Sequence, residues 1–285
     1  MQKHERLRVN GSGDYEFSVH SEFIEEDIEF IQKNCIKTII LDNSQIFTES
    51  SLDRINILDI DRLIIHPRTL KSFDYSGLKF FKHLRFLIIQ NDRPDSIDVS
   101  ENLELEYLLV ANGTKLEGLE KLRKLESLVI TKPKIKHLSS ELFKSLTSLT
   151  HLTLNCTSLE AGFSFLEYTN IKSLKLFRVK NIDFTKIDEL ELNYLELEQC
   201  KDAINKSHLY QLKSLETLKI IDSFNIHSSK DLENLSELKI LVVLGKSFFE
   251  DGDLSSLKYK LNHFGFDNKK HYSIKFEDFK SNFLR

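Results

Sequence analysis

Few residues in this sequence have the types and spacing that catalysis requires. Gly245, Lys246 and Ser247 form a Gly-Lys-Ser triplet directly after an apolar run, like the end of a phosphate-binding loop motif. The first glycine of that motif would fall at Ile240, and no other glycine is near. Because the phosphate cradle is made by a glycine-rich backbone, we expect no nucleotide site in this segment.

The cysteines and paired carboxylates also lack the arrangement of a reactive site. Cys35, Cys156 and Cys200 are far apart in the sequence, and no Cys/His pair has the short separation of a zinc site. Glu196 and Glu198 lie two residues apart, so they share one face of a strand, where solvated carboxylates are common. Acid–base catalysis by such a pair would need a cleft. We therefore predict a protein that is not an enzyme and that has no cofactor and no bound metal.

Composition narrows the class of protein further. The 285 residues are 40% hydrophobic and 29% charged, which is typical of a folded chain, and the formal net charge is −4. No concentrated basic surface points to nucleic acid, and no apolar run is long enough for a secretory signal or a membrane span. Three cysteines do not make a disulfide framework. We expect a cytoplasmic protein that binds neither nucleic acid nor membrane.

The main signal is an internal repeat of the pattern L-x-x-L-x-L, with Ile or Val at some positions. Ten copies begin between residues 36 and 238, so the nine intervals average about 22 residues, within the range of leucine-rich repeats. A single copy could come from any amphipathic helix, whereas ten at near-constant spacing indicate one repeating unit. The copies begin at Ile36, Ile60, Leu84, Leu105, Leu125, Leu149, Ile171, Leu192, Leu215 and Leu238.

Over roughly residues 35–246 the chain resembles the leucine-rich-repeat family, and each repeat is similar to the short internalin-like subclass. The stretch 116–138 shows this best, because Leu119, Leu122, Leu125, Leu128 and Ile130 fit the spacing, as do Ile135 and Leu138. The resemblance implies an α/β fold, a curved right-handed solenoid with about ten parallel strands on its concave side. It also implies a role in binding proteins.

One feature departs from the family pattern. The ninth repeat position usually holds Asn or Cys, whose side chain bonds the backbone of the turn, but here only Cys200 fits. Because backbone groups at the turns still need partners, we expect less regular turns, or water in place of the Asn. The other ninth positions hold Ser44, Arg68, Asp92, Gly113, Pro133, Thr157, Val179, Ser223 and Lys246.

Both ends of the chain are predicted to cap the solenoid, because its terminal core faces need cover. Residues 1–34 are expected to form a cap with a strand near 14–20 and an amphipathic helix through Ile28 and Ile31. Residues 35–246 form the solenoid. Residues 247–285 are expected to form a second cap, with a helix over 254–264 that ends at Gly265 and a strand over 272–276.

The third, fifth and seventh positions of each repeat are predicted to point away from the core onto the concave face. In the first five repeats the fifth position forms an aliphatic stripe, with two aromatic residues beside it. Large apolar patches often mark interaction sites, but β-branched residues are also simply good strand formers that can cover one another. The predicted protein-binding residues are Ile40, Ile64, His66, Phe86, Ile88, Tyr107, Leu109, Val129, His151, Lys175, Phe177, Tyr194 and Glu196.

These observations predict a non-catalytic module that binds a partner protein on the concave face. One specific form is an inhibitor or immunity-type protein that acts by occupying its target. The alternative is a structural solenoid that associates with itself through the apolar stripe. The sequence leaves the identity of the partner and the oligomeric state open, since fold alone does not set function.

Overall fold

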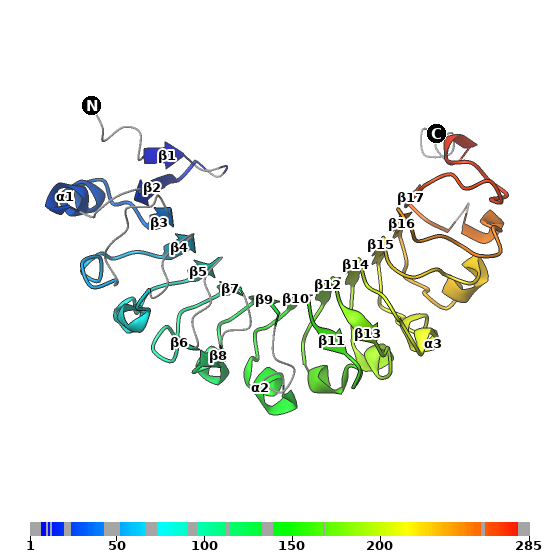
Figure 1. Cartoon of the computed structure of the whole chain (residues 1–285), viewed down its shortest axis with the longest axis horizontal. Helices are drawn as coiled ribbons and strands as arrows, with labels where there is room; N and C mark the ends of the chain where they lie inside the picture. Colours follow the sequence, from blue (N-terminus) through cyan, green and yellow to red (C-terminus); the bar gives the residue numbers. More distant parts are fainter. Residues whose placement is uncertain are drawn as a thin grey trace. The chain divides into compact units, whose positions relative to one another are not determined.

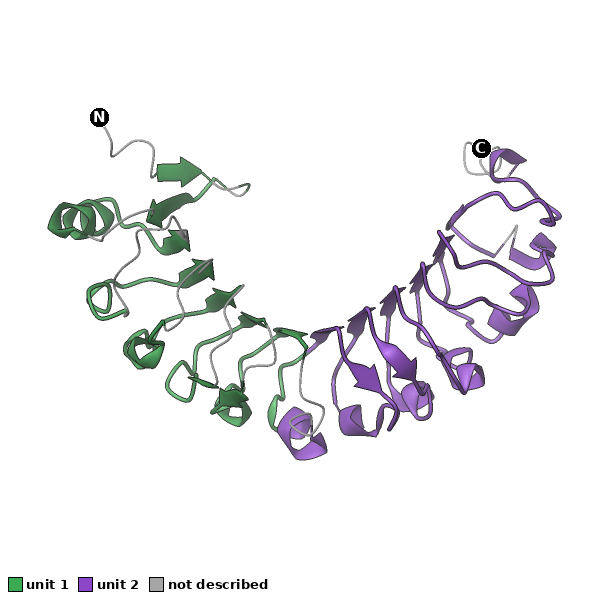
Figure 2. Cartoon of the chain, viewed as in Figure 1, with its two compact units in different colours: residues 1–133, 145–149 green, residues 134–144, 150–285 purple. Residues whose placement is uncertain are grey.

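The computed structural model describes residues 7–9, 11, 13–19, 24–42, 52–66, 73–90, 96–111, 115–132, 139–167, 169–257 and 260–278. The chain divides into two compact units (Figure 2). Unit 1 contains residues 1–133 and 145–149, and unit 2 contains residues 134–144 and 150–285. Each unit consists of short strands that are joined by return segments.

The strands of unit 1 follow one another in sequence order across the sheet (Figure 1). The first two are antiparallel, and every later pair in this unit is parallel. Parallel neighbours need a crossover connection, which the return segments supply. The strands are β1 (Leu7–Val9), β2 (Tyr15–Val19), β3 (Thr38–Asp42), β4 (Arg62–His66), β5 (Phe86–Ile89), β7 (Tyr107–Val110) and β9 (Ser127–Thr131).

Unit 2 repeats the same plan, and its sheet strands are all parallel. Each strand pairs with the next without a shift in register, so equivalent repeat positions lie side by side. The strands are β10 (His151–Asn155), β12 (Ser173–Phe177), β14 (Tyr194–Glu198), β15 (Thr217–Ile221), β16 (Ile240–Leu244) and β17 (His263–Phe266).

The return segments are short and varied. They contain three α-helices, several 3₁₀ turns and two small parallel pairs of strands among the described residues. In chain order these are α1 (Glu25–Lys33), η2 (Ser76–Phe80), β6 (Ser96–Asp98), β8 (Lys115–Glu117), η3 (Leu119–Lys121), α2 (Ser140–Ser145), β11 (Ser158–Leu159), η5 (Ser164–Leu166), β13 (Lys180–Ile182), η6 (Ile187–Glu189), α3 (Lys206–Leu209), η7 (Ser229–Leu232) and η8 (Ser255–Leu257).

The core lies between the sheet and the return segments. Side chains alternate along each strand, and the fourth and sixth repeat positions are buried while the third, fifth and seventh are mostly half-buried. Leu63 and Ile65 on β4, and Leu195 and Leu197 on β14, show this alternation. The predicted inward and outward register of the strands is confirmed in both units.

The carboxyl-terminal end differs from the prediction. Instead of a helix over 254–264, the short turn η8 is followed by β17, which pairs in parallel with β16. The segment Leu261–Phe266 is a further copy of the repeat, with Phe264 and Phe266 in place of leucine. Their rings lie 4.5 Å apart and fill the end of the core.

The strand predicted over 272–276 is also wrong. Tyr272 is buried, and its hydroxyl oxygen accepts a hydrogen bond of 2.9 Å from the backbone N–H of Phe249. Alternation of apolar residues here reflects packing against β17, since the Tyr272 ring lies 5.9 Å from that of Phe266. At the other end, the predicted strand (β2) and helix (α1) are both present.

The turns after the strands share one backbone conformation. The eighth repeat position has a positive φ, between 47° and 69°, in every repeat from the strand β9 to the strand β16. This left-handed conformation is unusual for residues other than glycine, and here it bends the chain out of the sheet at each repeat. The residues are Lys132, Cys156, Arg178, Gln199, Asp222 and Gly245.

A ladder of small side chains bonds the turns of unit 2 where an Asn would be expected. The backbone N–H of Cys200 donates to Ser223 Oγ at 2.9 Å, and that of Ser223 donates to Ser247 Oγ at 2.8 Å. The Cys200 thiol donates to the carbonyl oxygen of Leu176 at 3.3 Å. The expectation of less regular turns is therefore wrong for these repeats. Hydroxyl and thiol groups bond the turn backbone, as the side-chain amide of Asn does in the family pattern. The ninth positions 44, 68, 92, 113 and 133 lie outside the described residues.

We predict that Ser223→Ala lowers the free energy of unfolding by about 1–3 kcal/mol, since it leaves the backbone N–H of Cys200 without its partner. Urea denaturation measures this. Ser236→Ala is the matched control, because that exposed hydroxyl donates only a long 3.3 Å bond to Lys213 O. The control should stay within about 0.5 kcal/mol of the wild type. Equal losses in both variants would contradict a structural ladder.

Candidate functional site

The face of the sheet opposite the core, here called the open face, carries an apolar row in unit 1. Ile40, Ile64, Ile88, Leu109 and Val129 occupy the same repeat position on five successive strands and pair in register. All five are half-buried. We name these five residues the aliphatic row.

An aromatic stack lies beside the aliphatic row, two residues earlier on the strands. The rings of Phe86 and Tyr107 are nearly parallel, with centroids 4.3 Å apart and an interplanar angle of 11°. The guanidinium of Arg62 lies 3.9 Å from the centroid of the Phe86 ring, a cation–π arrangement. Burial raises the pKa of the Tyr107 hydroxyl above its ordinary value. Arg62, Phe86 and Tyr107 thus form one preassembled surface.

The degree of exposure bears on whether the aliphatic row is a binding surface or a set of strand-forming side chains that cover one another. None of its members is among the strongly exposed large apolar residues in the described part of the chain, which include Phe80 and Leu103 on return segments. Neighbouring side chains in the row therefore cover one another in part. Each member keeps part of its surface accessible, and no described element of unit 1 lies over this face of the strands (Figure 1).

The two predicted histidines occupy different units. His66 ends β4 in unit 1 and is half-buried. His151 begins β10 in unit 2, is exposed, and its Nδ1 lies 2.8 Å from Thr150 Oγ1.

The open face of unit 2 carries a cluster of polar side chains that contact one another. Tyr194 donates its hydroxyl proton to Glu196, and the ammonium groups of Lys175 and Lys219 lie 5.4 Å and 5.2 Å from its ring centroid. Glu196 pairs in register with both lysines. Burial, then the bond to Glu196, raises the pKa of Tyr194, and the bond to Tyr194 raises the pKa of Lys219.

This cluster brings together three predicted residues and adds one. Lys175, Tyr194 and Glu196, all predicted to bind, lie together, and Lys219, which was not predicted to bind, completes the group. Lys219 holds the fifth repeat position, which is predicted to face the concave side, and this could have identified it from the sequence. Phe177, also predicted, is half-buried on β12 and pairs in register with Glu198.

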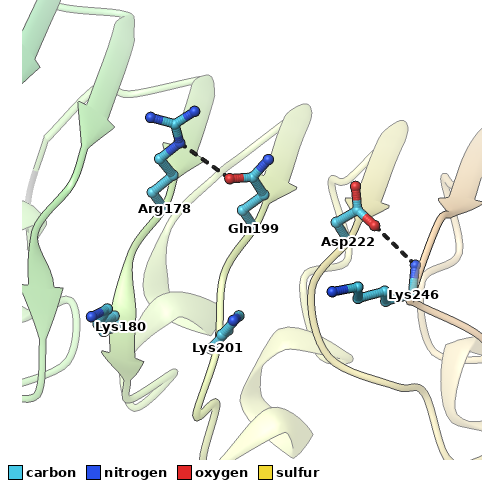
Figure 3. A pocket seen from close by; sticks show the side chains of 6 residues that line it. All are labelled: Arg178, Lys180, Gln199, Lys201, Asp222 and Lys246. Atoms are coloured by element: carbon cyan, nitrogen blue, oxygen red, sulfur yellow. Dashed lines mark hydrogen bonds between the residues drawn. The ribbon is translucent and has the colours of Figure 1, made fainter.

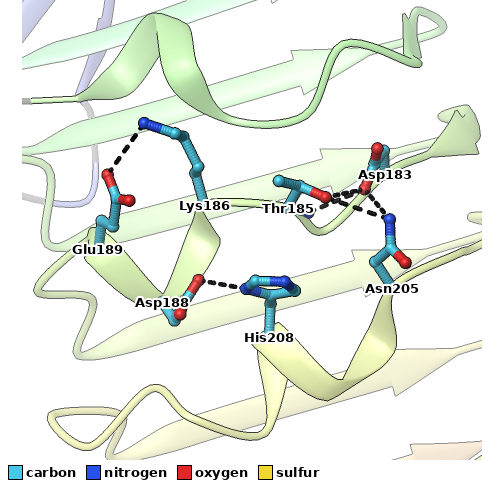
Figure 4. Close-up of polar contacts among 7 residues, drawn as sticks. All are labelled: Asp183, Thr185, Lys186, Asp188, Glu189, Asn205 and His208. Atoms are coloured by element: carbon cyan, nitrogen blue, oxygen red, sulfur yellow. Dashed lines mark hydrogen bonds and ion pairs between the residues drawn. The ribbon is translucent and has the colours of Figure 1, made fainter.

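A polar network joins the return segments of unit 2 (Figure 4). Asp183 accepts hydrogen bonds from Thr185 Oγ1 at 2.7 Å and from Asn205 Nδ2 at 2.9 Å, and these bonds lower its pKa. His208 lies 2.7 Å from Asp188 through Nδ1. The Thr185 hydroxyl donates to Asp183 and accepts a bond from Asn205, and it has no bond to His208. These residues therefore do not form a pair of nucleophile and general base.

The thiols differ sharply in environment. Cys200 is buried, and burial raises its pKa to about 11, so its thiolate is scarce near neutral pH. Cys35 is exposed. Within the described ranges, no three or more His, Cys, Asp or Glu side chains gather as metal ligands would. None of the helices in those ranges has both the length and the apolar character that a membrane crossing demands.

Comparison with solved structures identifies the fold as that of leucine-rich-repeat proteins, as the sequence predicted. An internalin from Listeria monocytogenes matches with a TM-score of 0.54 and 17% sequence identity, covering 90% of this chain and 83% of the internalin chain. A leucine-rich-repeat protein of Leptospira interrogans matches with a TM-score of 0.46 and 18% identity, covering 89% of this chain and 77% of the other. The sequence matches no protein-family model and no curated protein.

The raised pKa of Cys200 predicts a pH dependence of stability. As pH rises from the ordinary thiol pKa of 9.0 towards about 11, the unfolded thiol ionises while the folded thiol keeps its proton, so the free energy of unfolding falls. Below this window both states are protonated and the contribution is constant. Urea unfolding at several pH values should show a shallower alkaline decline for Cys200→Ala. Parallel pH curves for the two proteins would refute it.

Proposed function

We propose that this protein is a non-catalytic module that binds a partner protein through the open face of unit 1. The observation that carries the proposal is the aliphatic row with the aromatic stack of Arg62, Phe86 and Tyr107 beside it. Its side chains are fixed by in-register strands and retain accessible apolar surface. Preorganised aromatic and arginine side chains of this kind are enriched among residues that dominate protein–protein binding energy.

The mode of action that fits is occupancy. The described polar clusters bond the repeats to one another and offer no nucleophile with an oriented base. A module of this kind changes its partner by covering it, as an inhibitor or an immunity-type protein does. The leucine-rich-repeat fold supports a protein partner, because its rigid strands hold a large surface ready for contact. We propose the cytoplasm as its location, where three free thiols would stay reduced.

The test compares two double variants of unit 1. Ile88→Glu with Tyr107→Glu places charge in the row and the stack, and Phe80→Glu with Leu103→Glu places the same charge on exposed return segments. We expect a partner captured by the wild type to be lost by the first variant and kept by the second. With the purified partner, calorimetry should show a loss of at least about 2 kcal/mol, as expected for two central contacts.

Circular dichroism and melting temperature serve as the folding control for both variants. Retention of the partner by the folded open-face variant, together with its loss by the return-segment variant, would move the binding surface to the other side of the sheet.

The oligomeric state separates this function from self-association. Light scattering after size-exclusion chromatography should give the monomer mass of 33.3 kDa for the wild type. A dimer that the Ile88→Glu and Tyr107→Glu substitutions convert to a monomer would instead make the open face a homotypic contact.

A further inference from the structure

A row of basic side chains lies at the carboxyl ends of the unit 2 strands. Because neighbouring repeats stack in register, their eighth to tenth positions gather at one edge of the sheet. They line a cavity of about 440 Å³ there (Figure 3). The lining residues are Arg178, Lys180, Gln199, Lys201, Asp222 and Lys246.

The charge of this cavity is unbalanced. Four of its lining residues are cations and one, Asp222, is a carboxylate, whose Oδ1 accepts a bond of 3.1 Å from the backbone N–H of Lys246. Within the described part of the chain, the ammonium groups of Lys180, Lys201 and Lys246 make no ion pair. Burial of a ligand's negative charge among them would therefore break no existing pair.

Some other lysines of unit 2 are paired with a carboxylate of the adjacent repeat. Lys172 Nζ lies 2.6 Å from Glu191, and Lys239 Nζ lies 3.1 Å from Glu216. These pairs show that the stacking readily provides an acidic neighbour. At the cavity, the lining residues include one carboxylate, that of Asp222, for four cations.

The cavity is held in place by bonds within the turns. Arg178 Nε donates to Gln199 Oε1 at 3.1 Å, which orients the guanidinium and leaves its terminal nitrogens available (Figure 3). The backbone N–H groups of Arg178, Gln199 and Asp222 donate to carbonyl oxygens of the next repeat. A ligand's negative charge must therefore be met by side chains.

The absence of a side chain at Gly245 leaves room for Asp222, the carboxylate of the cavity, to bond the turn. The φ of Gly245 is 69°, and a Cβ at this position would lie 2.2 Å from Asp222 Oδ1. Glycine thus allows the Asp222 side chain to fold against the turn and bond the backbone N–H of Lys246. The bond directs one oxygen of Asp222 to the backbone, and the four cations of the lining outnumber its single negative charge.

We propose that this cavity binds an extended acidic segment of a polypeptide. From β12 to β16 there are three inter-strand steps, or about 14 Å, so the cations form a line rather than a point. An extended chain advances about 3.3 Å per residue, and four or five residues with several carboxylates would match that line. A compact phosphate could reach only part of it.

A nucleic acid fits less well. A duplex or long single strand would extend beyond the cavity, and the chain as a whole has a net charge of −4. A short acidic segment places its charge only where the lysines are. This site goes beyond the proposed function, because it requires only residues of unit 2 and no contact with the aliphatic row.

The test uses the full chain and a fluorescein-labelled hexaglutamate peptide, with hexaglutamine as the neutral probe. Fluorescence anisotropy should show binding of hexaglutamate only, weakening as salt is added, since exposed ion pairs are screened. Lys180→Glu with Lys201→Glu should lower the affinity at least about tenfold, because both changes convert attraction to repulsion. Lys180→Arg with Lys201→Arg should retain binding.

Two control variants isolate the site. Lys213→Glu with Lys230→Glu makes the same change of charge on exposed residues of unit 2 outside the cavity and should bind like the wild type. Ile88→Glu with Tyr107→Glu should also bind the peptide normally, so failure of the proposed function would leave this result standing. Should the charge reversal unfold the chain, Lys180→Gln with Lys201→Gln replaces it.

Three results would overturn the proposal. The first is hexaglutamate binding that the folded cavity variants leave unchanged. The second is equal loss in the control reversal, which would mean general attraction to unit 2. The third is tighter binding of tripolyphosphate or oligothymidylate than of hexaglutamate, which would assign the cavity to phosphate groups or nucleic acid.

Discussion

The structure depends on one constraint, that a single strand with its return segment cannot bury its own apolar side chains. Leu174, Leu195 and Leu218 hold the same position on consecutive strands, and each is fully buried because the repeats on either side cover it. A chain built this way needs side chains of the same size at the same spacing in every repeat. At β17, Phe264 and Phe266 stand in place of leucine, and their rings pack with that of Tyr272.

The same constraint leaves the rest of each repeat free to vary. Strand register is set by the buried positions, so the side chains on the open face fall into rows whatever their chemistry. The row is aliphatic in unit 1 and becomes the cross-linked set of Lys175, Tyr194, Glu196 and Lys219 in unit 2. The turn positions stack in a further row, where Arg178, Lys201 and Lys246 gather. One scaffold therefore presents surfaces of different character without any change to its core.

Low sequence identity to the Listeria internalin is what this division of roles predicts. In this chain the inward strand positions hold Leu, Ile, Val or Phe. The turn itself can be bonded by different groups, as the Cys200, Ser223 and Ser247 ladder shows. The same fold can therefore hold different side chains on its open face.

By itself, the sequence determined the repeat, its period and the inward or outward side of each strand position, because leucine spacing encodes the register along one strand. It also placed Phe86 and Tyr107 beside the aliphatic row. Tertiary structure alone decided that residues 263–266 form a strand, since Leu254, Leu257 and Leu261 also fit helical spacing. It alone showed the Ser223 ladder and the joining of Lys180, Lys201 and Lys246 at one cavity. These groups are roughly 20 or more residues apart in the sequence, and the stacking of the repeats decides which of them lie close together.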